Sequence, residues 1–106
     1  NFNTSNVTNM GSMSYDCINI TSLDMSGFNT SNVTNMSFMF GSCDSLTTLD
    51  ISNFDTSNVT NMYKMFTNCY KLKKIYMRGC NQTTIDRIKE ALTNEGILNN
   101  VTIVTE

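Results

Sequence analysis

One nine-residue string, FNTSNVTNM, constrains this chain more than any other feature. It occupies residues 2–10, returns unchanged at 28–36 and appears again at 54–62 as FDTSNVTNM. A fixed period of 20–50 residues is typical of repeat architectures, in which one small unit stacks on the next. A single unit of this size cannot bury both of its faces, so neighbouring copies have to cover each other. The sequence therefore predicts a stack of 26-residue units.

Aligning the chain at this period gives nine apolar columns that continue through residues 80–106, although the letters differ there. We therefore predict three 26-residue repeats over residues 1–79, the first one incomplete at its N-terminus, and a divergent C-terminal capping repeat over residues 80–106. Glu95 stands where the other copies have Cys, and terminal repeats need a polar outer face. In the first copy the columns begin at Phe2, Val7, Met10, Met13, Ser14, Cys17, Ile20, Leu23 and Met25.

Each copy also contains a stretch with helical spacing. Residues 59–66 place Val59, Met62, Met65 and Phe66 on one helical face, and Ser57 precedes them as a predicted N-cap. Asn, Thr and Val have low helix propensity, so we expect helices of only about two turns in the first three copies. Residues 81–96 should form the longest helix, which Gly96 ends. The caps expected in the other copies are Ser5, Ser31 and, together with Asp86, Thr83.

A period-2 pattern follows each helical stretch, as in residues 48–52, where Leu49 and Ile51 alternate with polar residues. The spacing L-x-x-L-x-L-x-x-F from Leu46 to Phe54 is the leucine-rich-repeat pattern. The expected fold is an α/β repeat, a leucine-rich-repeat solenoid with a short parallel sheet on the concave side and short helices on the convex side.

The string LTTLDISNFDTSNVTNM at residues 46–62, with its partial copies, resembles the BspA-like leucine-rich-repeat surface proteins, a 26-residue repeat type of mycoplasmas, lactobacilli and gut bacteria. The resemblance covers residues 1–80 closely and the remainder by column only. It implies a non-catalytic binding or adhesion module at the cell surface or outside the cell.

The outward positions of the predicted strands are the candidate binding residues, because solenoids bind through such extended sheets. Tyr76 lies between two cations in the third copy, and Tyr and Arg are enriched in interface hot spots. The alternative is that both cations only offset Asp50 across adjacent strands, which contributes little to stability. The predicted site on the concave face comprises Lys74, Tyr76, Arg78, Asp24 and Asp50.

Several sharper interpretations compete with plain core packing. Cys17, Cys43 and Cys69 share a column; buried thiols are the favoured interpretation, with a disulfide or a metal ladder as alternatives. All eight methionines fall in apolar columns, which favours core filling over an adaptable binding surface. The Asn-Val-Thr sequon recurs because the repeat recurs. We expect neither a metal nor any other cofactor.

Three functions remain open from the sequence. The favoured one is recognition of a protein or glycan on a host or neighbouring cell; the alternative is a structural spacer or stalk in a larger surface protein. An enzyme is not expected, because the chain has no His and no assignable nucleophile–base pair. The basic residues are too few for nucleic acid, and no apolar run is long enough to span a membrane. Uncovered apolar residues in the first copy predict further upstream repeats or self-association at that end.

Overall fold

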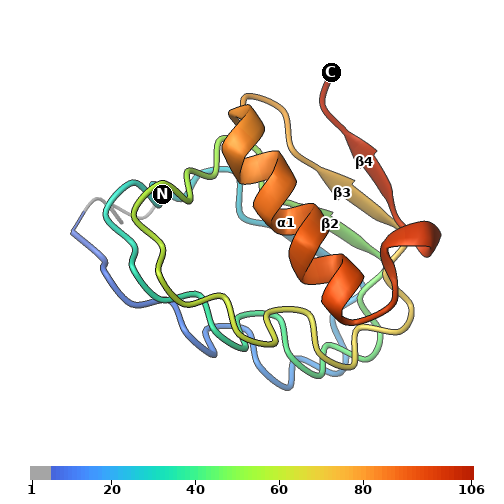
Figure 1. The fold of residues 1–106 in the computed structure, drawn as a ribbon. Coiled ribbons are helices and arrows are strands. Elements are labelled where there is room, and N and C mark those ends of the chain that lie inside the picture. The colour runs from blue at the N-terminus through green and yellow to red at the C-terminus, as the bar shows by residue number, and fades with distance from the viewer. Residues whose placement is uncertain (1–5) are drawn as a thin grey trace.

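The computed structural model describes residues 6–106, so the predictions made for Phe2 and Ser5 lie outside the described residues. The strands form one parallel sheet in the order β1-β2-β3-β4 (Figure 1). A single α-helix, α1, and a short 3-10 helix, η1, stand between the last two strands in the sequence. The elements are β1 Ser22–Asp24, β2 Thr48–Asp50, β3 Lys74–Tyr76, α1 Gln82–Asn94, η1 Leu98–Asn100 and β4 Thr102–Val104.

We call residues 6–27, 28–53, 54–79 and 80–106 copies 1 to 4. The sheet joins copies 1, 2 and 3 at the repeat spacing, because Leu49 lies beside Leu23 and beside Ile75 in the register. All three side chains point into the interior, and Leu49 and Ile75 are fully buried there. The strands predicted for these copies are therefore present but shorter than predicted, since the strand of copy 2 covers residues 48–50 and not 48–52. The parallel order matches stacking of successive copies.

Turns replace the short helices predicted in copies 1 to 3, so that prediction is wrong for the described residues 6–79. In copy 2 the amides of Met36, Phe38, Phe40 and Ser42 each donate to a carbonyl of copy 3, at 2.7–2.9 Å. Phe38 and Ser42 have φ of 56° and 57°, outside the right-handed helical region. Carbonyls of the next copy thus accept the amides that would donate within a helix. Because Asn, Thr and Val have low helix propensity, little stability is lost by not forming the helix.

The thiols of the cysteine column add a second link between copies. Cys43 Sγ donates to the Ser14 carbonyl at 3.0 Å, and Cys69 Sγ donates to the Phe40 carbonyl at 2.8 Å. Both residues are buried, and all four cysteines are free thiols. Burial raises the pKa of the Cys43 thiol and raises that of Cys69 to about 12. Core packing is therefore the correct interpretation for Cys43 and Cys69, whereas Cys17 and Cys80 are half-buried.

The methionine prediction is wrong at Met13 and holds only in part at Met62, which packs against the core without being fully buried. Met13 is 45% exposed, because no described copy covers that face of copy 1, while its column-mates Met39 and Met65 are buried between copies. Met62 is half-buried and lies at the surface beside α1. The other six methionines belong to the buried core.

Copy 4 contains the predicted long helix but starts it differently. The N-cap is Asn81, whose side chain accepts the Thr84 amide at 2.8 Å, so the cap predicted at Thr83 is wrong. Gly96 ends the helix with φ of 74°, as predicted, and its amide donates to the Thr93 carbonyl. Helix α1 is amphipathic and packs its apolar face, including Ile88 and Leu92, against copy 3.

The column assignment at the end of copy 4 is wrong by two residues. Ile75 pairs with Ile103, where the 26-residue period predicted Val101. Helix α1 and η1 together use two more residues than the turns of the other copies before the chain returns to the sheet. As a result Asn100 lies in η1, and β4 places Val104 beside Tyr76.

Candidate functional site

The open face of the sheet carries all five residues predicted as the binding site. Asp24, Asp50 and Tyr76 are direct neighbours in the parallel register, one on each of β1, β2 and β3. Lys74 lies two residues before Tyr76 on the same face, and Arg78 lies two residues after it, just beyond the end of β3. The structure thus gathers these residues on a single surface.

The two cations pack on the tyrosine ring. Lys74 Nζ lies 5.7 Å from the centroid of the Tyr76 ring, and Arg78 Cζ lies 4.6 Å from it. Arg78 Nε also donates to the main-chain carbonyl of Glu106 at 2.9 Å. Lys74 and Arg78 are exposed and Tyr76 is half-buried between them. We call Lys74, Tyr76 and Arg78 the basic cluster; its ring and its charges are held together by cation–π contacts.

The two aspartates stabilise turns at the ends of their strands. Asp24 Oδ1 accepts from the Ser26 hydroxyl at 2.6 Å and from the Ser26 amide at 2.9 Å. These bonds, the hydroxyl first and the amide second, hold the pKa of Asp24 below its ordinary value. Asp50 Oδ1 accepts the Ser52 amide at 2.9 Å. Such side chain-to-backbone bonds two residues apart are a known reason for Asp at turns, so the repeated Asp has a structural role here.

Ser52 and Arg78 depart from the predicted outward row. Ser52 is buried, and its hydroxyl accepts the Arg78 amide at 3.1 Å. The pleat therefore ends at Asp50 and Tyr76, and the positions two residues later belong to the turns rather than to the strands. Arg78 reaches the open face from such a turn.

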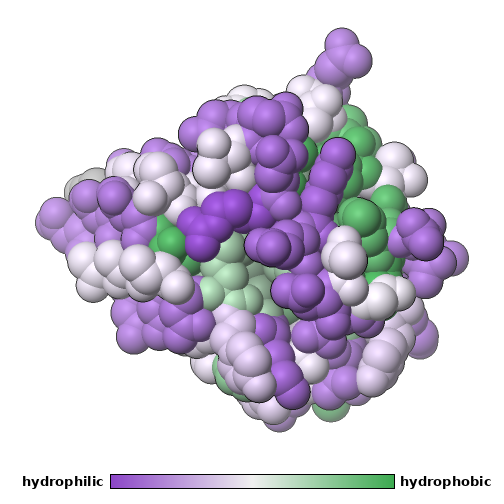
Figure 2. Space-filling view, in the orientation of Figure 1, coloured by the Kyte–Doolittle hydropathy of each residue, from purple (hydrophilic) through white to green (hydrophobic). Residues whose placement is uncertain are grey.

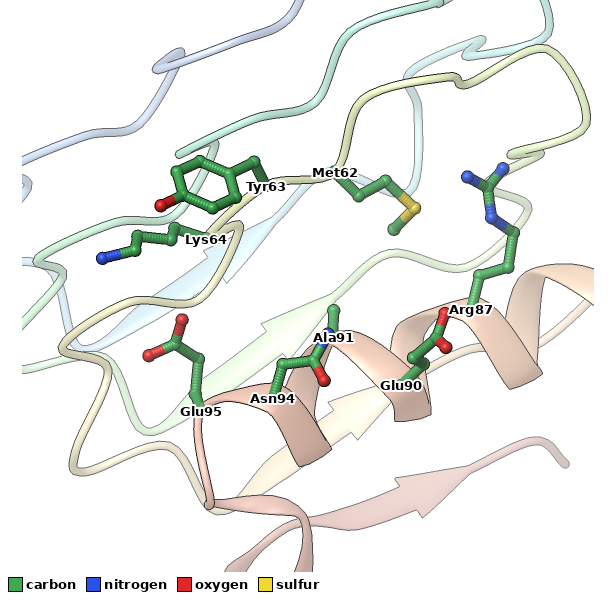
Figure 3. A pocket seen from close by; sticks show the side chains of 8 residues that line it. All are labelled: Met62, Tyr63, Lys64, Arg87, Glu90, Ala91, Asn94 and Glu95. Carbon is green, nitrogen blue, oxygen red and sulfur yellow. The ribbon is translucent and has the colours of Figure 1, made fainter.

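A groove beside α1 is a second candidate site, which the sequence did not predict. Its volume is about 380 Å³, and Figure 3 shows one wall from residues 62–64 of copy 3 and the other from α1. On the helix, Arg87, Glu90, Ala91 and Asn94 follow the spacing of one face. Met62, Tyr63, Lys64 and Glu95, the C-cap of α1, complete the lining.

Bonds at the first turns of α1 hold this end of the helix on copy 3. The Thr84 hydroxyl oxygen accepts the Thr56 amide at 3.0 Å, and the two hydroxyls lie 3.1 Å apart. Arg87 Nη1 donates to the carbonyls of Thr56 and Val59, at 2.7 and 2.8 Å. The groove lies beyond these contacts, along the later turns of the helix. Figure 2 shows a hollow beside α1 in which apolar surface is framed by hydrophilic side chains.

Tyr63 of the groove is the last member of a row of aromatic residues that crosses three copies. Tyr15 and Phe38 meet edge to face with centroids 6.1 Å apart, and Phe38 and Tyr63 do so at 5.7 Å. Lys64 Nζ lies 5.5 Å from the Tyr63 centroid. Tyr63 nevertheless remains 62% exposed, so its ring is oriented by neighbours and available to a ligand.

Within residues 6–106, no cluster of three or more His, Cys, Asp or Glu side chains is placed to hold a metal ion. The same part of the chain has no helix long and apolar enough to cross a bilayer.

The comparisons place the chain in a family. A family model described as "Mycoplasma protein of unknown function, DUF285" matches residues 1–101, and the chain belongs to this family. Searches of the curated proteins and of the solved structures each found no match.

Proposed function

We propose that this member of the Mycoplasma-type family is a non-catalytic recognition module at a cell surface, which binds a protein or glycan through the concave face of its sheet. In this proposal the fold is a leucine-rich-repeat solenoid of the BspA-like kind, and copy 4 is its cap. The parallel strand order and the 26-residue register between copies 1, 2 and 3 support the solenoid.

The observation that carries the proposal is the basic cluster on the open face of the sheet. Tyr76 offers a rigid amphipathic ring, and its two flanking cations are pre-positioned by cation–π contacts. Pre-organised side chains lose little conformational entropy on binding, which favours their use in an interface. The exposed charges of Lys74 and Arg78 would steer a partner that carries acidic groups.

The test begins with a screen of immobilised extracellular-matrix proteins and a glycan array against this chain. For a partner that binds, Tyr76→Ala is expected to weaken affinity by ~1–3 kcal/mol, the size of an aromatic hot spot. Lys74→Glu is expected mainly to slow association and to reduce its salt dependence. Tyr70→Ala, at a tyrosine that is 74% exposed outside the cluster, is the matched control.

A partner whose affinity survives Tyr76→Ala and Lys74→Glu, but is lost when Asp24 and Asp50 become Asn, would move the site to the acidic strands. Failure of every partner to bind would favour the spacer or stalk function instead, in which these side chains tolerate change.

A further inference from the structure

The groove between α1 and residues 62–64 has the chemistry of a carbohydrate site. We propose that it binds a neutral saccharide through main-chain amides of copy 3, the acidic side chains of α1 and the ring of Tyr63. This site is separate from the basic cluster on the sheet and does not depend on it.

Two backbone amides in the wall of the groove have no acceptor within the described residues. In copy 2 the amides of Met36 and Phe38 donate to carbonyls of the following copy, at 2.8 and 2.9 Å. The equivalent residues of copy 3 are Met62 and Lys64, which face α1, whose carbonyls are occupied within the helix. Within the described residues 6–106 these two amides have no hydrogen-bond partner. They therefore provide two donors of fixed direction in the wall of the groove.

The opposite wall of the groove, formed by α1 and its C-cap, carries hydrogen-bond acceptors. Glu90 and the helix C-cap Glu95 supply carboxylate oxygens, and Asn94 supplies both a donor and an acceptor (Figure 3). Vicinal hydroxyls donate and accept at once, so donors on one wall and acceptors on the other match them. Hydrogen bonds to an ionised carboxylate are also stronger than those between neutral groups.

The balance of charged side chains in the groove favours a neutral ligand over an ionic one. The groove contains two cations, Lys64 and Arg87, and two carboxylates, so its formal charge is balanced. Arg87 is already committed to two carbonyls of copy 3. An anion would meet both carboxylates and the negative end of the α1 dipole, whereas a cation would meet Lys64. A neutral, hydroxyl-rich ligand avoids both penalties.

Part of the groove is apolar. Met62 and Ala91 provide apolar surface between the polar groups, and the exposed ring of Tyr63 stands at the rim. A pyranose ring has an apolar face of C–H groups that packs on an aromatic ring while its hydroxyls point sideways. The volume of about 380 Å³ falls within the usual range for small-molecule sites.

The test is a titration of the ¹⁵N-labelled chain with lactose, maltose, cellobiose and N,N′-diacetylchitobiose, observed through the backbone amide signals. We expect saturable shifts of the Met62, Lys64 and Ala91 amides with at least one of these sugars. Tyr63→Ala should weaken that binding about tenfold, and Glu90→Gln with Glu95→Gln should weaken it by a similar factor. Tyr70→Ala and Tyr76→Ala should leave it unchanged, which separates this site from the basic cluster. Circular dichroism verifies that each variant is folded.

Three outcomes would overturn the proposal. One is the absence of these shifts with all four sugars up to about 10 mM, which is weak binding on the usual affinity scale. Another is stronger binding of 3′-sialyllactose than of lactose, which would show an anion site. The last is a response to a peptide of residues 33–41 without any response to sugars. The carbonyls of Asn35 and Ser37 in this segment accept the copy 1 amides that are equivalent to those of Met62 and Lys64.

Discussion

Replacing Thr84 with Val tests whether a buried hydroxyl pair fastens α1 to the rest of the chain. Thr56 and Thr84 are both fully buried, and Thr84 Oγ1 accepts the Thr56 amide at 3.0 Å and lies 3.1 Å from the Thr56 hydroxyl. Valine has nearly the same shape, so the substitution leaves no cavity. It does leave the Thr56 amide and hydroxyl without these partners.

The magnitude follows from the two groups left unpaired. A buried polar group without a partner costs about 1–3 kcal/mol, so two such groups lower the free energy of unfolding by about 2–6 kcal/mol. Such a loss is a large share of the ~5–15 kcal/mol by which a folded domain is typically stable. Thr56→Val should cost less, about 1 kcal/mol, because the Thr84 hydroxyl oxygen still accepts the Thr56 amide.

Urea unfolding monitored by circular dichroism measures these losses. Thr83→Val, one residue earlier on the exposed side of the same helical turn, is the control and should stay within ~0.5 kcal/mol of the parent. The double variant should lose less than the sum of the single losses, with a coupling of at least ~0.5 kcal/mol. If Thr84→Val unfolds at the same urea concentration as Thr83→Val, this pair does not hold the helix on copy 3.

Two further predictions concern the core. Ile88→Asp places a charge at a position with no solvent exposure and should destabilise copy 4 by ~3 kcal/mol or more; a variant that melts like Lys89→Ala, at the exposed neighbour, would contradict the packing of α1. The pKa of Cys69 is raised to about 12 from an ordinary 9, so the unfolded chain loses this proton first as the pH rises. The free energy of unfolding should therefore fall between pH 9 and 12. Urea titrations at successive pH values should show a smaller fall for Cys69→Ala, and an equal fall in this variant would refute the role of Cys69.

The strands and most of the core could be predicted from the sequence, because their signal is local and repeated. Leu49 and Ile75 each occupy an alternating apolar position, and the repeat predicts that they are neighbours. One polar column, which contains Thr30 and Thr56, was not predicted to be buried although it is equally regular. Thr30 and Thr56 are buried, and Thr30 Oγ1 accepts the Asp55 amide at 2.7 Å. This threonine recurs in every copy of the nine-residue string, but its burial depends on a hydrogen-bond partner in the next copy, which the sequence of one copy does not show.

The predicted short helices were wrong because helical spacing and stacked turns bury the same residues. Val33, Met36, Met39 and Phe40 are fully buried in the observed turns, as they would be on a helix. The difference lies in the backbone amides, which bond to another copy 26 residues away, and no local pattern reports that. The left-handed φ at Phe38 and Lys64 carries no sequence signal either, since neither residue is glycine.

The groove could not be predicted because it arises from a mismatch between two kinds of backbone. The turn amides of copies 1 and 2 donate to carbonyls of the next copy, whereas α1 uses its carbonyls for its own amides, so this exchange stops at copy 3. The amides of Met62 and Lys64 in copy 3 therefore lie beside a helix that offers them no acceptor. In the proposed saccharide site, a ligand with acceptor oxygens would accept hydrogen bonds from these amides.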